Sequence, residues 1–456
     1  MKIAIIGAGW AGMATAVEAT QAGHHAIVFE ASREVGGRAR AVNSALPDGT
    51  PVTLDNGQHI LIGAYSETLR LLRRVGVQPD TALLRRPMTL VFPDGQGLHF
   101  PAWPTPLDAL AGIVAARGWS VVDKWSLLRV ATGWQIGGFQ CGAATSVAQL
   151  CHALSPRVMA ELIEPLCVSA LNTPAGRASA QVFLRVMQDA LFGVQGGSNL
   201  LLPRVDLSEL FPQAAARWLI ERGGQLRLGL RVDSVLPQGS QWQLQGEVFD
   251  AVIFATSASE SVRALENSAQ AAPDSIANKI RHWTQITRAL QFEAITTVYG
   301  WGPNAVLPHP MLTLRSNAAT QTPNPTAPPA PAQFVFDRGQ LGGPHGLLAF
   351  VVSASMGDRE TLQAQVLVQA QQQLGLTLQA VQTIVEKRAT FACTPGLQRP
   401  AQNIAPGLLV CGDYVAGPYP ATLEGAVRSA MAAVQSTLGL PYDSTPRSTM
   451  NKEPAQ

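Results

Sequence analysis

A glycine-rich turn close to the first residue is the sequence feature that most constrains the fold of this chain. Residues 7–12 read Gly-Ala-Gly-Trp-Ala-Gly, and they lie between a short apolar run at 2–7 and a helical pattern at 12–22. A second apolar run follows at 24–30. Strand, glycine turn, helix and strand in this order predict a β-α-β unit that holds a dinucleotide by its phosphates.

Each glycine of the turn has a separate task. Gly7 permits a tight turn, Gly9 lets the backbone approach a pyrophosphate, and Gly12 lets the helix pack closely on the strand. Glu30 ends the second strand, where a carboxylate accepts hydrogen bonds from the adenosine ribose and disfavours a 2′-phosphate. The expected contacts with the dinucleotide in this unit are Gly7, Gly9, Trp10, Ala11, Gly12, Glu30 and Ala31.

A second pair of glycines follows the acid within a few residues. Residues 34–38 read Glu-Val-Gly-Gly-Arg, which resembles the second signature of the FAD-dependent amine oxidase and phytoene desaturase superfamily. Paired glycines allow close approach, and an arginine neutralises a pyrophosphate. The resemblance implies FAD as the cofactor, in contact with Gly36, Gly37 and Arg38.

Four later segments carry the same resemblance. Residues 55–59 match the segment beside the flavin ring, and residues 231–235 match a backbone clamp on the adenine. Residues 407–413 match a late strand that reaches the ribityl chain or pyrophosphate, and residues 422–426 match a helix start at the flavin pyrimidine edge. A helix N-terminus there stabilises negative charge on the reduced flavin. The cofactor contacts implied by these segments are Gly57, Gln58, His59, Val232, Gly412, Asp413, Thr422, Leu423, Glu424 and Ala426.

The order of the predicted elements indicates an α/β fold with two domains. We expect a Rossmann-like (GR2-type) FAD-binding domain and a second, mixed sheet-plus-helix substrate domain. The FAD-binding domain is expected to be discontinuous, built from residues 1–75, 200–265 and 385–440. Residues 76–199 and 266–384 are expected to form the substrate-binding, largely helical domain. The composition of 318–332 predicts a flexible Pro-rich loop, and that of 443–456 a disordered tail.

Hydrophobic periodicity predicts the individual elements in more detail. We expect a hairpin at 41–62, a helix at 67–75, a mostly helical stretch at 107–192, one amphipathic helix at 207–222, strands at 225–235, 242–249 and 251–255, and a glutamine-rich helix at 360–385.

Charge and cysteine content exclude several classes of protein. Only 14% of the residues are charged and the formal net charge is +2, so no strong field attracts nucleic acid. The five cysteines are widely spaced without a CxxC, which fits neither a disulfide framework nor a metal site. No apolar run reaches the roughly 18 residues of a spanning helix. We expect a cytoplasmic protein without a metal, whose membrane contact is peripheral, on the inner face of the cell membrane.

The middle of the chain resembles one particular group within this superfamily. Residues 162–174 and 196–206 are similar to hydroxysqualene dehydroxylases, a desaturase-like FAD-dependent group. The resemblance implies reduction of hydroxysqualene, a C30 isoprenoid, to squalene for hopanoid synthesis, with squalene-pathway enzymes as partners. The apolar residues of 107–192 suit a tunnel for such a substrate, and they equally suit an ordinary helical core.

Three alternatives stay open at this point. A carotenoid or other polyprenoid desaturase would run hydride transfer toward the flavin. An FAD-containing amine oxidase needs an aromatic pair around the amine, for which Tyr414 and Tyr419 are the candidates. A lipid carrier would hold FAD only as a structural element.

Loss of an allylic hydroxyl requires an acid, and His59 is our candidate because the resemblance puts it near the flavin. A histidine that is hydrogen-bonded in the core or to FAD would fit the same pattern. Asp55 is expected as a structural or ribityl-side contact. Asp189 is expected to form a solvated ion pair with Arg185, four residues earlier on a helix. The role of Glu164 stays open.

Four tryptophans fall within residues 101–139, namely Trp103, Trp119, Trp125 and Trp134. Arg117 and Lys124 lie among them. Indole rings favour the headgroup boundary of a bilayer, so this segment is a candidate for peripheral membrane contact. Tryptophans buried in a helical core would produce the same pattern.

Overall fold

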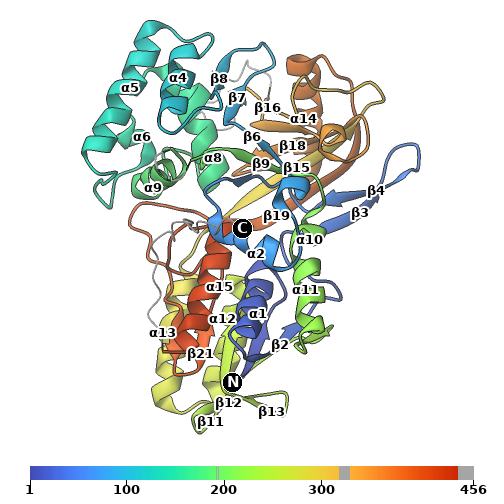
Figure 1. The fold of residues 1–456 in the computed structure, drawn as a ribbon, viewed down its shortest axis with the longest axis vertical. Helices are drawn as coiled ribbons and strands as arrows, with labels where there is room; N and C mark the ends of the chain where they lie inside the picture. Colours follow the sequence, from blue (N-terminus) through green and yellow to red (C-terminus); the bar gives the residue numbers. More distant parts are fainter. Residues whose placement is uncertain (192, 194, 318–328, 440–456) are drawn as a thin grey trace, which may run out of the picture.

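The computed structural model describes residues 1–191, 193, 195–317 and 329–439. The expected loop at 318–332 lies mostly outside these residues, and the expected tail at 443–456 lies wholly outside them. The described chain has two lobes, one below the other in Figure 1. Both lobes combine sheets with helices, which confirms the predicted α/β class.

A six-stranded sheet forms the base of the first lobe. Its strands, in spatial order, are β10 (Gln225–Leu228), β2 (His25–Glu30), β1 (Lys2–Ile6), β14 (Ala251–Phe254), β21 (Leu408–Val410) and β20 (Asn403–Ala405). All neighbours run parallel except β20, which is antiparallel to β21. Strands β1, β14 and β21 are almost entirely buried, which explains their unbroken apolar sequences.

Helices cover both faces of this sheet. They are α1 (Trp10–Gln21), α10 (Leu207–Leu210), α11 (Pro212–Glu221), α12 (Ala258–Ala271), α13 (Asp274–Arg288) and α15 (Leu423–Thr437). Ile3 and Ile5 of β1 pack in one apolar core with α1, α11 and α15. Ala4 and Ile6 pack in the other core with α12 and α13. Side chains that alternate along β1 thus hold the two helical layers on opposite faces.

A five-stranded antiparallel sheet forms the centre of the second lobe. Its strands, in spatial order, are β16 (Met311–Thr313), β17 (Phe334–Asp337), β18 (Leu347–Ser353), β15 (Phe292–Trp301) and β19 (Gln379–Phe391). Helix α14 (Arg359–Leu374) packs on one face through Leu362, Val366 and Ala370. The opposite face, which carries Phe334 and Phe336, belongs to the large core shared with the first lobe.

The helical group of the second lobe lies beside this sheet (Figure 1). Its elements are α4 (Leu107–Ala115), α5 (Val121–Ile136), α6 (Val147–Leu150), α7 (Pro156–Val158), a π-helical turn (Met159–Ile163), α8 (Glu164–Leu171) and α9 (Ala180–Leu191). This confirms the predicted helical stretch at 107–192 as far as residue 191. No helix in the described ranges is long and apolar enough to cross a bilayer.

Short strands and helices connect the larger units. They are β3 (Ala41–Ala45), β4 (Pro51–Asp55), β5 (Leu61–Ile62), α2 (Ser66–Arg74), α3 (Pro79–Ala82), β6 (Leu83–Arg86), β7 (Thr89–Val91), β8 (Gly97–His99), β9 (Leu200–Pro203), β11 (Leu236–Gln238), β12 (Gln241–Leu244), β13 (Glu247–Phe249) and a 3-10 turn (Gly339–Leu341). The predicted hairpin is present as β3–β4, although it ends at Asp55 and not at residue 62.

Several predicted boundaries are wrong for a local reason. The strand expected at 225–235 stops at Leu228, because Gly229 turns the chain with a φ of +70°. The single strand expected at 242–249 is a hairpin, β12–β13, which turns at Gln245 and Gly246 with φ of 48° and 83°. The helix expected at 207–222 is divided at Phe211, whose φ of −145° is not helical.

The helix expected at 360–385 is also wrong in its second half. Helix α14 ends at Leu374, where Gly375 caps it in a left-handed conformation with a φ of 69°. Residues from Gln379 onward form β19, the strand at the edge of the second sheet, and its long antiparallel pairing with β15 overrides the helical pattern. This strand runs to Phe391, past residue 385, where we expected the FAD-binding domain to resume.

Candidate functional site

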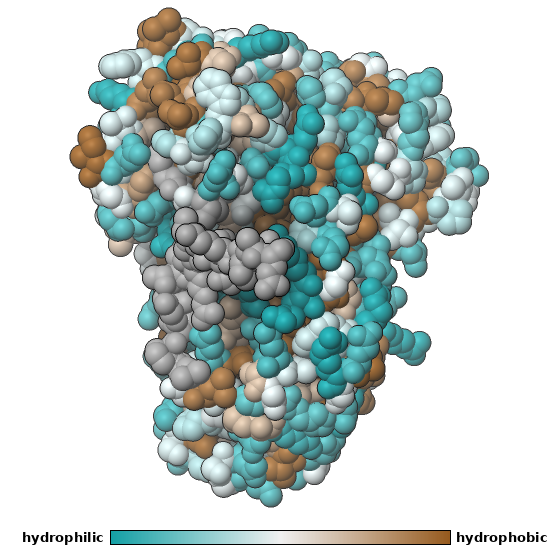
Figure 2. Space-filling model, in the orientation of Figure 1, coloured by the Kyte–Doolittle hydropathy of each residue, from teal (hydrophilic) through white to brown (hydrophobic). Residues whose placement is uncertain are grey.

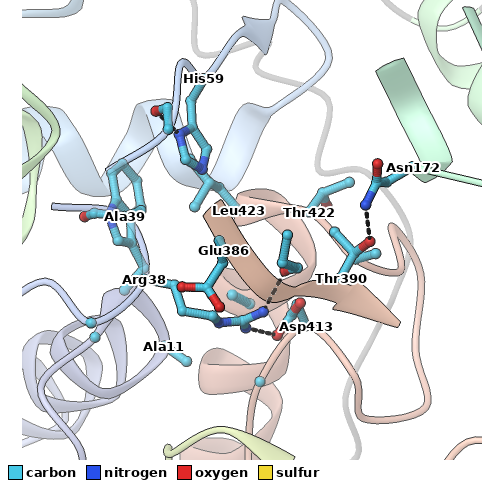
Figure 3. Close-up of a pocket in the computed structure, with 18 of the residues that line it drawn as sticks. Ala11, Arg38, Ala39, His59, Asn172, Glu386, Thr390, Asp413, Thr422 and Leu423 are labelled. Carbon is cyan, nitrogen blue, oxygen red and sulfur yellow. Dashed lines mark hydrogen bonds and ion pairs between the residues drawn. The ribbon is translucent and has the colours of Figure 1, made fainter. Parts of the chain in front are cut away.

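One cavity of about 780 Å³ lies where the two sheets and helices α8 and α9 meet (Figure 3). Almost all of the residues expected to bind the cofactor line it. They are Gly7, Gly9, Trp10, Ala11, Glu30, Ala31, Gly36, Gly37, Arg38, Gly57, Gln58, His59, Val232, Gly412, Asp413, Thr422, Leu423 and Ala426. Segments from both ends and the middle of the sequence therefore converge on one space.

Two glycine turns form a narrow cradle at one end of the cavity. The Gly36 N–H donates to the Ala8 carbonyl at 2.8 Å, which holds the second turn beside the first. A Cβ placed on Gly9 would stand 3.8 Å from the Gly37 Cα, in the space between the turns. Gly9 also precedes α1 and, as a glycine, has no side chain to cap it. The first N–H groups of α1 therefore face a site shaped for a phosphate.

Gly12 has a different task and does not line the cavity. A Cβ on Gly12 would stand 1.8 Å from the carbonyl oxygen of Gly7, so helix and strand approach too closely for any side chain. This agrees with the packing role expected for Gly12 from the sequence.

The Glu30 carboxylate lies at the edge of the cradle. Its Oε2 accepts a hydrogen bond from the Ala8 N–H at 2.7 Å, and its Oε1 accepts one from the Ser32 N–H at 2.8 Å. Each carboxylate oxygen can accept a further hydrogen bond. Glu30 thus fixes the turn and still presents acceptors to a ribose in the cavity.

Arg38 connects the cradle with the rest of the cavity. Its Nη2 donates to the Asp413 Oδ1 at 2.6 Å, and its Nη1 donates to the Ala389 carbonyl at 2.6 Å (Figure 3). The charge of Asp413 raises the pKa of Arg38 above its ordinary value. The side chain remains about one-third exposed, so it can also contact an anion in the cavity.

The loop that contains residues 56–59 lies beside the start of α15 (Figure 3). The His59 Nδ1 is 2.7 Å from the Gly57 carbonyl, which can only accept, so Nδ1 carries the proton. Burial lowers the pKa of His59. The neutral ring therefore presents Nε2 as an acceptor, and it would donate a proton only after being protonated itself.

Thr422 caps α15 by accepting the Gly425 N–H at 3.0 Å, and Thr422, Leu423 and Ala426 line the cavity. Glu424 does not line it. Its side chain is fully buried on the other side, where it accepts from Thr68 and pairs with Arg428 at 2.7 Å. Glu424 thus anchors α15 to α2, and only its backbone belongs to the helix start.

The cavity continues from the cradle into an apolar chamber. Its walls come from α8, α9 and one face of the five-stranded sheet, and they include Leu166, Val168, Val186, Met187, Ala190, Ile295, Phe334, Phe336 and Val351. The residues on α8 and α9 lie within 107–192, for which a substrate tunnel was one of two expectations, whereas the residues on the sheet were not identified from the sequence as a site. Phe334 and Phe336 alternate in β17 and so share one face, but the strand is buried along its whole length and its sequence does not show that this face borders a cavity.

One aromatic pair and one ion pair border this chamber. The rings of Tyr65 and Tyr419 are edge-on, with centroids 6.3 Å apart, and both residues line the cavity. Tyr414, proposed from the sequence as the partner of Tyr419, is buried and hydrogen-bonded to Ser261, so that pairing is wrong. The backbone is strained here, since Tyr419 has a φ of 56°.

The ion pair expected between Arg185 and Asp189 is present at 2.8 Å, but it is not fully solvated. Asp189 is only 15% exposed and lines the cavity, and burial together with the charge of Asp189 raises the pKa of Tyr419. Asp55 does not line the cavity, and it accepts the Leu207 N–H at 2.8 Å. Burial raises the pKa of Glu164, which accepts the Ala175 N–H at 3.3 Å as a structural contact.

The comparison with known families agrees with this geometry. A model described as flavin containing amine oxidoreductase matches residues 10–438. The chain belongs to that family. FAD is therefore its cofactor, and the glycine cradle, the Glu30 acceptors and the exposed part of Arg38 fit the adenosine and pyrophosphate of FAD.

Several relatives within the family are named. Hydroxysqualene dehydroxylase of Rhodopseudomonas palustris is 25% identical over 469 residues, which cover 95% of this chain and 97% of that protein. The enzyme of the same name from Sinorhizobium fredii is 27% identical over 231 residues, 50% of this chain and 52% of that protein. Zeta-carotene desaturase of Solanum lycopersicum is 30% identical over 128 residues, 27% of this chain and 21% of that protein.

The fold also has counterparts among solved structures. An oxidoreductase from Methanosarcina mazei superposes with a TM-score of 0.68 at 16% identity, covering 95% of this chain and 100% of that chain. The resemblance to hydroxysqualene dehydroxylases drawn from residues 162–174 and 196–206 is confirmed as a resemblance by near-full-length relatives of that name.

Proposed function

We propose that this chain catalyses the reductive dehydroxylation of hydroxysqualene to squalene with FAD. One observation carries the proposal. A single cavity joins the cofactor cradle to a chamber walled by apolar side chains of α8, α9 and the five-stranded sheet. An isoprenoid chain needs apolar walls next to the reacting flavin, and two relatives aligned over 95% of this chain have the name of this activity.

The reaction balances with reduced FAD as the only reductant. Reduced FAD supplies two electrons and two hydrogens, so that R–OH and reduced FAD become R–H, water and oxidised FAD. The C–O bond of the allylic alcohol breaks and a C–H bond forms at the same carbon. The task of the protein is to hold the alcohol carbon near the flavin, exclude bulk water and stabilise positive charge on that carbon.

Asp189 is our candidate for the stabilising charge. Its carboxylate is only 15% exposed at the wall of an apolar chamber, so its field is screened less there than in water. A fixed negative group near a developing allylic cation lowers the energy of the transition state. His59, as a neutral ring with Nε2 free to accept, is suited to orient the substrate hydroxyl or receive a hydrogen bond from water.

The second candidate function is that of a polyprenoid desaturase, in which the same cavity would bind a more saturated chain and the flavin would oxidise it. The alignment of zeta-carotene desaturase with 27% of this chain favours it. The two functions differ in the direction of electron flow, which an experiment can read directly.

The test uses the purified holoprotein under anaerobic conditions. The flavin is reduced, hydroxysqualene is added, and flavin absorbance and product mass are followed together. One squalene formed per flavin reoxidised supports the dehydroxylase. Bleaching of the oxidised flavin by a more saturated polyprenoid replaces it with the desaturase, and no redox response to either substrate refutes both.

Asp189→Asn tests the proposed role of the charge in the same assay. We expect reoxidation by hydroxysqualene to slow by about 10²-fold, in the range of other preorganised electrostatic groups. Asp94→Asn is the matched control, because Asp94 forms an ion pair of the same 2.8 Å length with Arg315 outside the cavity lining. Equal rates for the two variants would remove Asp189 from the reaction.

A further inference from the structure

Helices α4 and α5 leave a row of large apolar side chains in solvent. Among the exposed residues are Val121 at 83%, Val122 at 73% and Trp125 at 67%. We define the α4–α5 face as Trp103, Leu107, Leu110, Val114, Val121, Val122 and Trp125. Figure 2 shows apolar side chains gathered at the upper left, over the position of these helices in Figure 1. Isolated exposed apolar residues are common, but a contiguous set marks an interaction surface.

The sequence spacing of the exposed apolar residues shows that α4 presents them on one side. Leu107, Leu110 and Val114 recur at intervals of three and four, which aligns them on one side of α4, and Trp103 lies in the segment just before this helix. The other side of α4 is already buried through Ala109, Gly112 and Ile113. Helix α4 is therefore apolar on two sides, and only one of them has a partner in the described chain.

The charged residues around the α4–α5 face favour an anionic partner. Residues 101–140, all of which the structure describes, contain two acids, Asp108 and Asp123. Both are buried, at 6% and 9% exposure, and Asp123 is engaged with Ser120 in a capping box. The bases Arg117 and Arg129 are exposed in the same segment. The surface is thus apolar with a basic rim and no exposed carboxylate of its own.

The face belongs to the helical layer that walls the substrate chamber. Trp134 of α5 packs edge-on against Phe183 of α9, with ring centroids 6.2 Å apart. On the same helix α9, Val186, Met187 and Ala190 line the cavity. Helix α9 therefore lies between α5, which carries part of the exposed apolar face, and the apolar chamber.

From these observations we propose that the α4–α5 face docks on an anionic lipid bilayer. Its aliphatic side chains enter the boundary between headgroups and acyl chains, the indoles of Trp103 and Trp125 lie at headgroup level, and the basic rim contacts anionic headgroups. The docking is peripheral, and it brings the helical layer that walls the apolar chamber against the phase in which an isoprenoid dissolves.

The test measures binding of the holoprotein to lipid vesicles, so it does not depend on turnover or on the identity of the substrate. Vesicles of phosphatidylcholine with one-third phosphatidylglycerol are compared with pure phosphatidylcholine by cosedimentation. We expect stronger binding to the anionic vesicles, weakened by salt. The double variant Val121→Glu/Trp125→Glu should reduce the partition coefficient at least tenfold.

Met356→Glu is the matched control, because Met356 is 80% exposed, lies in the loop after β18 and is not one of the residues of this face. It should bind as the wild type does, and flavin content and Tm confirm that both variants are folded. Equal binding of wild type and double variant, or no binding of the wild type, overturns the proposal. Self-association of the wild type that the double variant abolishes, without vesicle binding, assigns the face to a second copy of the chain.

Discussion

Replacement of Glu30 by alanine tests the cofactor site at its most informative residue. In the structure each carboxylate oxygen accepts one backbone N–H, from Ala8 and Ser32 at 2.7 and 2.8 Å. The remaining acceptor positions are those that a ribose of FAD would use. A hydrogen bond to a charged acceptor contributes about 1.5–3 kcal/mol. Loss of one ribose contact should therefore weaken FAD binding about 10- to 160-fold.

The assay must separate this effect from damage to the turn, because the variant also leaves two backbone N–H groups without their acceptor. FAD is removed, the apoprotein is titrated with FAD by flavin fluorescence, and its Tm is measured in parallel. Glu34→Ala is the control, since Glu34 lies in the same turn but is exposed and outside the cavity lining. A lowered Tm with less than a twofold change in affinity would show that Glu30 supports the turn and does not contact the ribose.

Three further substitutions separate the site from the fold. Gly9→Val should leave the apoprotein folded, since the nearest atom to a Cβ there is 3.8 Å away, and abolish FAD retention; a purified variant with full flavin absorbance would contradict this. Gly12→Ala places a Cβ 1.8 Å from the Gly7 carbonyl and should lower the yield of folded protein, measured by circular dichroism. Burial raises the pKa of Asp55 from 3.8 to about 6, so the folded state loses stability as pH rises between these values. Asp55→Asn removes that loss, and its Tm relative to wild type should rise over the same range; a constant difference would refute the ionisation.

The cofactor cradle can be predicted from sequence because the residues that shape it are close together in the chain. Gly7 has a φ of +107° and Gly12 touches the preceding turn, so both positions require glycine. Glu30 follows at the end of the next strand, where the parallel sheet places it beside the turn. Local geometry and one strand pairing suffice to assemble this part of the site.

The apolar chamber cannot be predicted in the same way. Its walls join α9 with β17 and β18, which lie more than a hundred residues later. Strand β17 is buried along its whole length, so its sequence does not distinguish a side that faces a cavity from one that faces a core. The position of Asp189 in the cavity wall could not be predicted either. Periodicity places Asp189 on the polar side of α9, but it does not reveal that this side borders a cavity.

The error in the second half of 360–385 had a local signal. Gly375 follows the helical pattern directly, as expected of a helix C-cap, and the β-branched Thr383, Ile384 and Val385 are typical of a strand. The glutamine-rich composition masked both cues. Strand propensity and a capping glycine should therefore be weighed against periodicity when the apolar pattern is weak.

The contacts of Arg38 tie two parts of the protein to one cation. The same guanidinium holds Asp413, next to the six-stranded sheet, and the carbonyl of Ala389 in β19 of the other sheet. If cofactor binding alters the hold of Arg38 on β19, thermodynamic reciprocity requires a ligand that moves β19 to alter the affinity for the cofactor by the same factor. Ligand binding in the chamber and FAD binding would then be coupled equilibria, and the contacts of Arg38 would couple them.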